Sequence, residues 1–454
     1  MTRIRFVAGK KVYKPDLYIV LVILYRVFLD WSYFEIFVKN YDYFNFINKA
    51  TINSYGISWG LLLLFTALVK GCYKSHVFSK EILYLLFLIS IVPFTTMIGF
   101  QQFTLGYIFW NSTYWIIFLL LDKISSNIEK FRNIKINMQS IASSKMLKII
   151  ALVSFAVVLY ISSKYTGFRF YFSFSGTYDL RVQAREFNMP TLLRYAFSWT
   201  RAINPILFAY FMRSKQHIFS GLCIIIQLLS FGINGMKSTL FFMAIVIAIN
   251  LLPRFLLRRM NQLILFSMAG LGLISYLEYF IRGTYYIASL IIMRVMFLPN
   301  LISFYYYDFF STHTPDYFRA SILRFVGAVT PYPDLQHLIG NIYFHSEAMG
   351  SNDGLIADAL TNFGLIGIFI MPVVLLVSFK LIDKVVEGLD ERLYIIEAVI
   401  LTLTLISNFF TSILLTNGLI LVMILLKIMK KASFDIHKIK LIPKRFLFYR
   451  RQRV

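Results

Sequence analysis

The stretch His345-Ser-Glu-Ala-Met-Gly-Ser-Asn-Asp-Gly354 lies near the end of the longest polar break in a chain that consists largely of apolar segments. This break runs over residues 282–358 and also contains Tyr305-Tyr-Tyr-Asp-Phe-Phe310. Connections of this length are usually functional or disordered, and this one keeps too many aromatic and aliphatic residues for a disordered segment. We therefore expect it to cover an active site.

The composition is that of a membrane protein. Of the 454 residues, 58% are hydrophobic and 15% are charged, and the mean hydropathy is +0.67, whereas soluble domains carry roughly 25% charged residues. The net charge of +24 does not indicate a nucleic-acid partner, because nearly all of it lies in short loops and tails beside apolar segments. This placement is typical of orientation in a membrane and of contact with anionic lipids. The two cysteines, Cys72 and Cys223, predict neither a disulfide framework nor a zinc site.

Twelve apolar segments of about 20 residues are predicted to span the membrane. They are 17–38, 55–69, 82–100, 103–121, 147–163, 191–212, 218–233, 238–252, 263–281, 360–379, 393–409 and 413–428. The first follows basic residues and has no small-residue cleavage site, so we interpret it as a retained anchor.

Charge predicts the orientation of these spans. With the N-terminus in the cytoplasm, every second connection is basic, as the positive-inside rule requires, and the basic tail at 427–454 is cytoplasmic as well. The prediction is an all-α polytopic membrane protein with a single integral membrane domain and about twelve spans. Its two large outer loops are 164–190 and 282–358.

Two parts of the second outer loop have helical patterns. Residues 289–310 are apolar enough for a thirteenth span, but that span would put the basic tail outside and would contain Arg294 and Asp308. An interfacial or re-entrant helix fits better. The piece at 316–330 is predicted to be an amphipathic helix on the membrane surface, with apolar residues at helical spacing: Phe318, Ile322, Phe325 and Val329.

The first outer loop contains a cluster of basic residues. If 175–186 is helical, Arg181 and Arg185 share a face at i and i+4, with Tyr178 one turn earlier. Basic residues on one face, with few carboxylates near them in sequence, favour an anionic ligand.

The next span carries Arg194 and Arg201, seven residues apart and hence on one face. At a rise of 1.5 Å per residue, Arg201 lies roughly 15 Å below the start of its helix, where a charge costs at least about 2.5–3.5 kcal/mol on insertion scales. This surplus of positive charge predicts an anion site, and arginine forks suit phosphate. The alternative is that the arginines reach lipid headgroups or pair with a distant carboxylate such as Glu278. Arg26 and Asp30, at i and i+4 in the first span, are expected to form a structural pair.

Further basic residues extend the predicted anion site. Arg282 and Arg294, at the start of the second outer loop, are assigned to it, whereas Arg324 is expected to steer a glycan or to lie at lipid headgroups. The sequence has no phosphate-binding glycine loop, nucleophile elbow or metal-spaced histidine pair. The first outer connection, 39–54, has a lone acid, Asp42, where metal-dependent polyprenyl-phosphate sugar transferases carry an acidic pair. This argues against a divalent metal ion.

Short motifs and the layout of the spans resemble those of one protein family. The motifs are Tyr178-Asp-Leu-Arg181 in the first outer loop, Gly235-Met-Lys-Ser238 opening a span, and Asn352-Asp-Gly-Leu-Ile-Ala-Asp-Ala359 leading into Phe363-Gly-Leu-Ile-Gly367. Together with the layout, which covers nearly the whole chain, they make the protein similar to the Wzy-type polymerases of O-antigen or capsule repeat units. These polymerases are relatives of the O-antigen ligases.

The resemblance implies a GT-C-like fold in the inner membrane of a bacterium, with both large loops in the periplasm. It implies polymerisation of undecaprenyl-diphosphate-linked oligosaccharides by inverting, metal-independent transfer without a cofactor. A polysaccharide chain-length regulator is a candidate partner. Carried over onto this sequence, Arg181 and Lys237 hold the diphosphate, and Asn352 belongs to the motif before the tenth span. The ligase relatives carry histidines immediately before this asparagine, whereas this chain has Met349-Gly-Ser351.

The identity of the general base is left open by that departure. A positioned base contributes about 10²- to 10⁴-fold, and fixed cations at the leaving diphosphate contribute the larger share. The candidate bases are His345, Glu347, Asp353 and Asp358. His345 and Glu347 rank first, because their flanks are polar.

Aromatic residues are the candidates for binding sugar rings. Tyr305 and Tyr306, with Tyr178 in the first outer loop, are expected to stack on sugar faces, although tyrosine is also an ordinary interfacial residue. Asn352 is expected to contact the glycan.

Two other classes of membrane protein compete with the polymerase. A flippase for lipid-linked oligosaccharides has a similar number of spans and a basic interior, but it leaves the long insertion at 282–358 unexplained. A metal-using polyprenyl-phosphate glycosyltransferase is disfavoured by the missing acidic pair.

Overall fold

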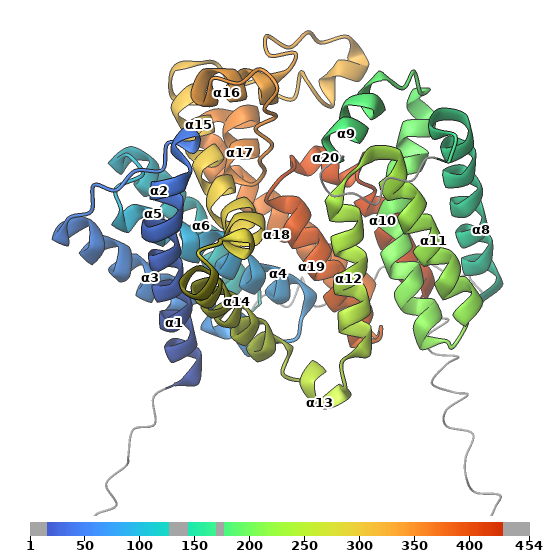
Figure 1. Cartoon of the computed structure of the whole chain (residues 1–454), viewed down its shortest axis with the longest axis horizontal. Coiled ribbons are helices and arrows are strands. Elements are labelled where there is room, and N and C mark those ends of the chain that lie inside the picture. Colours follow the sequence, from blue (N-terminus) through green and yellow to red (C-terminus); the bar gives the residue numbers. More distant parts are fainter. Residues whose placement is uncertain (1–15, 127–143, 169–176, 430–454) are drawn as a thin grey trace, which may run out of the picture.

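The structure is a computed structural model that describes residues 16–126, 144–168 and 177–429. All regular elements in these residues are helical, which confirms the all-α prediction, and they pack into one bundle (Figure 1). The N-terminal basic residues and nearly all of the tail at 427–454 lie outside the described residues.

The helices follow one another along the chain, joined by short connections. The α-helices are α1 (Leu17–Ser32), α2 (Val38–Asn40), α3 (Ile52–Tyr73), α4 (Phe78–Leu86), α5 (Val92–Gly99), α6 (Leu105–Ser125), α8 (Ser144–Ile161), α9 (Thr177–Glu186), α10 (Thr191–Arg213), α11 (His217–Asn234), α12 (Lys237–Leu251), α13 (Arg254–Leu257), α14 (Met260–Arg282), α15 (Leu298–Thr312), α16 (Leu335–Phe344), α17 (Ile356–Phe363), α18 (Gly367–Val386), α19 (Glu391–Leu405) and α20 (Phe410–Leu414). A further apolar helix covers Leu419–Met429. The π-helical segments are η1 (Tyr33–Phe37), η3 (Phe87–Ile91), η4 (Ser162–Thr166) and η5 (Ala288–Phe297), and the 3₁₀ turns are η2 (Asp42–Phe44), η6 (Leu323–Val326) and η7 (Gly364–Ile366).

Eight helices in the described residues are long and apolar enough to cross a membrane. This confirms a multi-pass membrane protein, while twelve spans remain a prediction. Seven of the eight coincide with predicted spans, and they are Leu17–Asn40, Ile52–Tyr73, Phe78–Gly99, Ser144–Thr166, His217–Asn234, Met260–Arg282 and Ile356–Val386. The predicted spans outside this set include α12 and α19, which have 15 residues each, and α10, which carries three arginines.

Elements from the two predicted outer loops lie at the same end of the bundle. Figure 1 shows α9 from the first loop and α16 from the second at the upper end, whereas α13 and the start of α1 lie at the lower end. We call the end with α9 and α16 the outer end and the other the inner end. The first large loop is only partly described, because residues 169–176 lie outside the described residues.

Residues 288–312 form the eighth membrane-length helix, inside the stretch assigned to the second outer loop. This helix, η5 with α15, has 25 residues, and an 18-residue window within it has a mean hydropathy of 1.5. It is packed inside the bundle: Phe297 contacts the Tyr33 ring, and the Asn300 amide donates to the Ser90 carbonyl at 3.2 Å. This packing does not fit a helix that lies only at the membrane interface, while the alternative expectation of a re-entrant helix stays a prediction. The π-helical part precedes Pro299, which has no N–H to donate to the Val295 carbonyl.

The amphipathic helix predicted at 316–330 does not form. The segment consists of turns and the short element η6, because Tyr317 and Phe318 adopt left-handed φ values of 52° and 62°, which a continuous α-helix excludes. Its apolar side chains are exposed, with Phe325 77% and Val329 83% accessible.

Polar pairs inside the bundle hold distant helices together. The predicted pair in the first span is confirmed: Arg26 Nε donates to Asp30 Oδ1 at 2.5 Å, and Arg26 is fully buried. Arg26 also donates to the hydroxyls of Thr95 and Ser58. A charge with this many partners is structural rather than available for a ligand.

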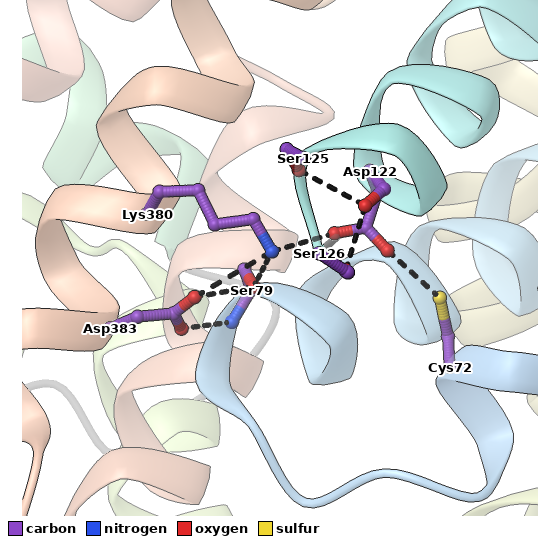
Figure 2. Close-up of polar contacts among 7 residues, drawn as sticks. All are labelled: Cys72, Ser79, Asp122, Ser125, Ser126, Lys380 and Asp383. Carbon is purple, nitrogen blue, oxygen red and sulfur yellow. Dashed lines mark hydrogen bonds and ion pairs between the residues drawn. The ribbon is translucent and has the colours of Figure 1, made fainter. Parts of the chain in front are cut away.

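A second network joins α3, α4, α6 and α18 (Figure 2). Lys380 Nζ lies 2.8 Å from Asp122 Oδ1 and donates to the Ser79 hydroxyl. Asp383 accepts hydrogen bonds from the backbone N–H and the hydroxyl of Ser79, and the Cys72 thiol lies 3.9 Å from Asp122. Lys380 follows a predicted span directly, so by sequence it counts among the basic loop residues that orient the protein in the membrane. Its side chain is only 12% exposed, however, and its ion pair joins α18 to α6 inside the bundle.

The motif at residues 352–359, before the tenth predicted span, packs closely against the end of α19. A Cβ atom on Gly354 would lie 1.9 Å from the Leu405 carbonyl oxygen and 2.5 Å from that of Asn408. The neighbouring carboxyl of Asp358 is buried, accepting from the Phe410 backbone N–H at 2.6 Å and from the Asn362 amide at 2.6 Å. The motif thereby fixes α17 against the outer end of α19.

We expect Gly354→Ala to destabilise the protein, because the clash is with backbone atoms that cannot rotate away. Overpacking of this kind costs about 1–3 kcal/mol. The measurement is the thermal midpoint of the purified protein in detergent. Gly221→Ala on α11 is the control, since a Cβ there meets nothing within 4 Å. An equal midpoint for both variants would contradict this packing.

Candidate functional site

A cavity of about 340 Å³ lies between α10, α11, α12, η5, α19 and the Leu419–Met429 helix. The helices α10, α12 and α19 pack against one another around it and lie together in Figure 1. We call it the main cavity. Its polar and charged lining includes Ser198, Arg201, Gln227, Ser238, Arg294 and Glu397.

Arg201 enters the main cavity with unused hydrogen-bonding capacity. Its Nε atom is buried and has no hydrogen-bond partner in the described part of the chain. Its other nitrogens contact the Met236 sulfur at 2.8 Å and the Ser198 hydroxyl at 3.4 Å, and the guanidinium lies 5.0 Å from the Phe197 ring centre. These partners are neutral, so the positive charge of Arg201 is not balanced by a carboxylate within salt-bridge distance among the described residues. An anion would complete this site.

The turn between α11 and α12 connects two of the predicted anion-binding elements. Arg181 on α9 donates from Nε to the Gly235 carbonyl at 3.3 Å, and Arg201 contacts the next residue, Met236. Gly235 ends α11 with φ +60°, in the left-handed region, and Lys237 begins α12. The first outer loop, the turn motif and the arginine of α10 therefore meet at one place.

Arg294 faces the same cavity from another element. It lies in η5, it is exposed, and it lines the main cavity with Arg201. The π-helical widening before Pro299 places it there, and such segments often occur at functional sites. Two of the predicted diphosphate-binding residues thus share a cavity.

The other predicted basic residues lie elsewhere. Arg194 is exposed and donates to the Phe187 carbonyl at 3.3 Å, so it holds the connection before α10. Arg282 is exposed at the end of α14. Glu278, weighed as a distant partner for the arginines, accepts instead from the backbone N–H groups of Tyr286 and Ile287.

Glu397 on α19 is a site residue that sequence reasoning missed. It lines the main cavity and is 3% exposed, and its Oε2 atom is buried without a hydrogen-bond partner in the described part of the chain. The signal was present in the sequence, since a carboxylate within a predicted span is a functional-site candidate by default.

The candidate bases of the second outer loop do not reach the main cavity. Its described lining includes none of His345, Glu347 and Asp353. His345 ends α16 with a left-handed φ of 51°, and both His345 and Glu347 are exposed. Asp358 is buried and engaged with α20, as described above, so it has no access to a substrate.

Asp353 lies beside the main cavity rather than in it. With Ser303 it lines a small cavity of about 10 Å³, which shares Pro299 and Ile406 with the main cavity. Asp353 accepts a short hydrogen bond of 2.5 Å from the Ser303 hydroxyl. Burial raises the pKa of Asp353 well above its usual value.

The predicted glycan-binding tyrosines are mostly covered by protein. Tyr306 is fully buried and donates to the Ser351 carbonyl at 3.1 Å. Tyr305 is 7% exposed and stacks on Tyr343 with ring centres 4.5 Å apart. Their faces are therefore occupied by the core, which corrects the expectation that they bind sugars.

The remaining predicted residues lie on the surface or outside the description. Arg324 is exposed in η6, and Asn352 is exposed just before Asp353. Tyr178 and Arg185 lie in α9, so the segment is helical as their expected shared face requires, but their side chains are outside the described residues.

No family model, curated protein or solved structure matches this chain. In the described residues, no three His, Cys, Asp or Glu side chains gather as metal ligands would. The features defined so far are those of a multi-pass helical membrane protein with a partly cationic cavity.

Proposed function

We propose that this chain polymerises undecaprenyl-diphosphate-linked oligosaccharide repeat units, as a glycosyltransferase of the bacterial inner membrane. The observation that carries the proposal is the meeting of Arg181, the turn at Gly235 and Met236, and Arg201 beside a cavity that Arg294 also lines. Each belongs to a motif or cluster that resembles the Wzy-type polymerases or was predicted to bind an anion.

The proposed reaction is an inverting transfer that does not use a metal ion. The hydroxyl oxygen of an acceptor repeat unit bonds to the anomeric carbon of the donor glycan, and the hydroxyl proton passes to water. The bond from that carbon to the diphosphate oxygen breaks, and the electron pair leaves with the diphosphate. Arg201 and Arg294 stabilise the charge that grows on the diphosphate, because fixed cations placed beside a developing negative charge lower its energy. The missing acidic pair near Asp42 supports the metal-independent form.

The test is growth of the glycan by purified protein in nanodiscs supplied with a synthetic undecaprenyl-diphosphate repeat unit. A ladder on a gel, with and without a chelator, is the expected result. Arg181→Ala and Lys237→Ala are expected to shorten or abolish the ladder. No ladder with several candidate repeat units, from protein that remains folded, would sink the proposal.

A flippase for lipid-linked oligosaccharides is the second candidate, and one observation favours it. The lining of the main cavity runs from Met236, beside the start of α12, to Pro205 and Glu397 in the middle of their helices, as a transport path would. A flippase moves the lipid-linked glycan across liposomes without changing its length. That outcome, in place of a ladder, would select it.

A further inference from the structure

Glu397 is a buried carboxyl that the diphosphate site does not explain. It lines the main cavity, its Oε2 atom has no hydrogen-bond partner among the described residues, and no described cation lies within salt-bridge distance of it. An unsatisfied buried carboxyl is costly. Arg201 and Arg294 share the cavity but do not pair with it, so the site presents an acceptor as well as cations.

Neighbouring amides in the cavity wall do not supply the missing donor. The Gln227 amide donates to the Thr239 carbonyl at 2.8 Å, and its oxygen accepts from Asn204. The Asn408 amide donates to the Thr404 carbonyl and to the Ser407 hydroxyl. Since these groups are engaged with the protein, a donor for Glu397 has to come from the contents of the cavity.

The size and the charges of the cavity restrict what that donor belongs to. At about 340 Å³ the cavity lies near the lower end of the usual range for ligand pockets, which suits one compact polar group rather than a whole oligosaccharide. Arg201 on one wall selects an anion, and Glu397 on another selects a hydroxyl or amide N–H. A glycosyl diphosphate carries both, because the sugar that bears the diphosphate also bears such donors.

We propose that Glu397 is a specificity residue that accepts a hydrogen bond from the sugar attached directly to the diphosphate. This inference rests on the proposed function, in that the main cavity takes a lipid-linked glycosyl diphosphate. The diphosphate binds at Arg201 whatever the sugar, and Glu397 discriminates among the sugars. A ligand that lacks the donor leaves Glu397 unpaired and binds more weakly.

The test is binding of short-chain analogues to the full-length protein in nanodiscs by calorimetry. The probes are farnesyl diphosphate and farnesyl diphosphate esters of glucose, galactose and N-acetylglucosamine. The wild-type protein is expected to bind at least one glycosylated probe about 2- to 10-fold more tightly than farnesyl diphosphate, which is the range for a hydrogen bond between uncharged groups. Glu397→Leu is expected to abolish this preference, so that the glycosylated probes bind no more tightly than farnesyl diphosphate.

Two further variants keep the outcome decisive. Glu397→Gln keeps an acceptor oxygen and should retain part of the preference, which a purely structural role would not produce. Glu391→Gln, at the exposed start of the same helix, should behave as the wild type.

The inference and the proposed function fail in different ways. A preference that survives in Glu397→Leu, or a wild-type protein that prefers none of the sugars to farnesyl diphosphate, would overturn the role of Glu397 and leave the diphosphate site standing. Unchanged affinity for farnesyl diphosphate in Arg201→Gln would instead remove the diphosphate site itself.

Discussion

Arg201→Gln is expected to lower the rate of glycan chain growth by about 10²- to 10³-fold, which is the usual cost of removing one preorganised group from a developing negative charge. The guanidinium faces the main cavity with a buried and unpaired Nε atom, so its positive charge is available to the leaving diphosphate. Arg201→Lys keeps the charge but loses the planar fork, and we expect an intermediate rate. The measurement is the initial rate of repeat-unit consumption in nanodiscs.

The same substitution is expected to leave stability unchanged or to raise it, because removing a buried charge without a carboxylate partner relieves a desolvation cost. A thermal midpoint measured on the same preparations shows whether a lower rate of chain growth comes from the active site or from unfolded protein. Arg259→Gln is the control, since Arg259 is an exposed arginine near the inner end, away from the main cavity. A rate for Arg201→Gln equal to that of the control would remove Arg201 from the mechanism.

Lys380→Met is expected to destabilise the protein by about 3–5 kcal/mol, the usual cost of breaking a buried ion pair by removing one partner. Without Lys380, the carboxylate of Asp122 loses an ion pair of 2.8 Å and Asp383 loses a nearby cation at 3.8 Å. The side chains of Asp122 and Asp383 are 6% and 14% exposed, so water does not replace the lost charge. The measurement is the free energy of unfolding, or the thermal midpoint, of purified protein.

Two further variants test whether the loss comes from charge. Adding Asp122→Asn to Lys380→Met removes one of the stranded carboxylates and should recover part of the stability. Lys70→Met breaks the pair with Asp16, also 2.8 Å long, whose side chains are about 40% exposed. Such surface pairs contribute about 0–1 kcal/mol. Equal losses of stability for Lys380→Met and Lys70→Met would contradict a stabilising role for the buried ion pair between Lys380 and Asp122.

Local pattern was sufficient to predict the helices and several contacts within them. Apolar length predicted most of the membrane-length helices, and the i, i+4 spacing of Arg26 and Asp30 predicted their ion pair, because both depend on residues close in sequence. The helix α9 meets the condition under which Arg181 and Arg185 were expected to share a face. The failures have local causes too: the left-handed Tyr317 and Phe318 interrupt the amphipathic pattern at 316–330.

Tertiary packing decided what the sequence pattern left open. Polarity favoured His345 and Glu347 as bases, but the fold leaves them exposed at the end of α16, away from the described lining of the main cavity. Tyr305 and Tyr306 have aromatic rings of the kind that stack on sugars, yet both side chains are buried in the core. Glu397 could have been singled out as a carboxylate within a predicted span, whereas the helices that surround it in the main cavity could not be read from spacing along one helix.

The central claim is that this chain lengthens a lipid-linked glycan at a cationic site on the outer end of the bundle. The most direct measurement is the mass of the lipid-linked product after wild-type protein in nanodiscs has been incubated with a single repeat unit on undecaprenyl diphosphate. The account predicts new masses separated by whole repeat units, together with released undecaprenyl diphosphate, and loss of both in Arg201→Gln. Folded protein that binds the substrate and leaves its mass unchanged, for every repeat unit supplied, would contradict it.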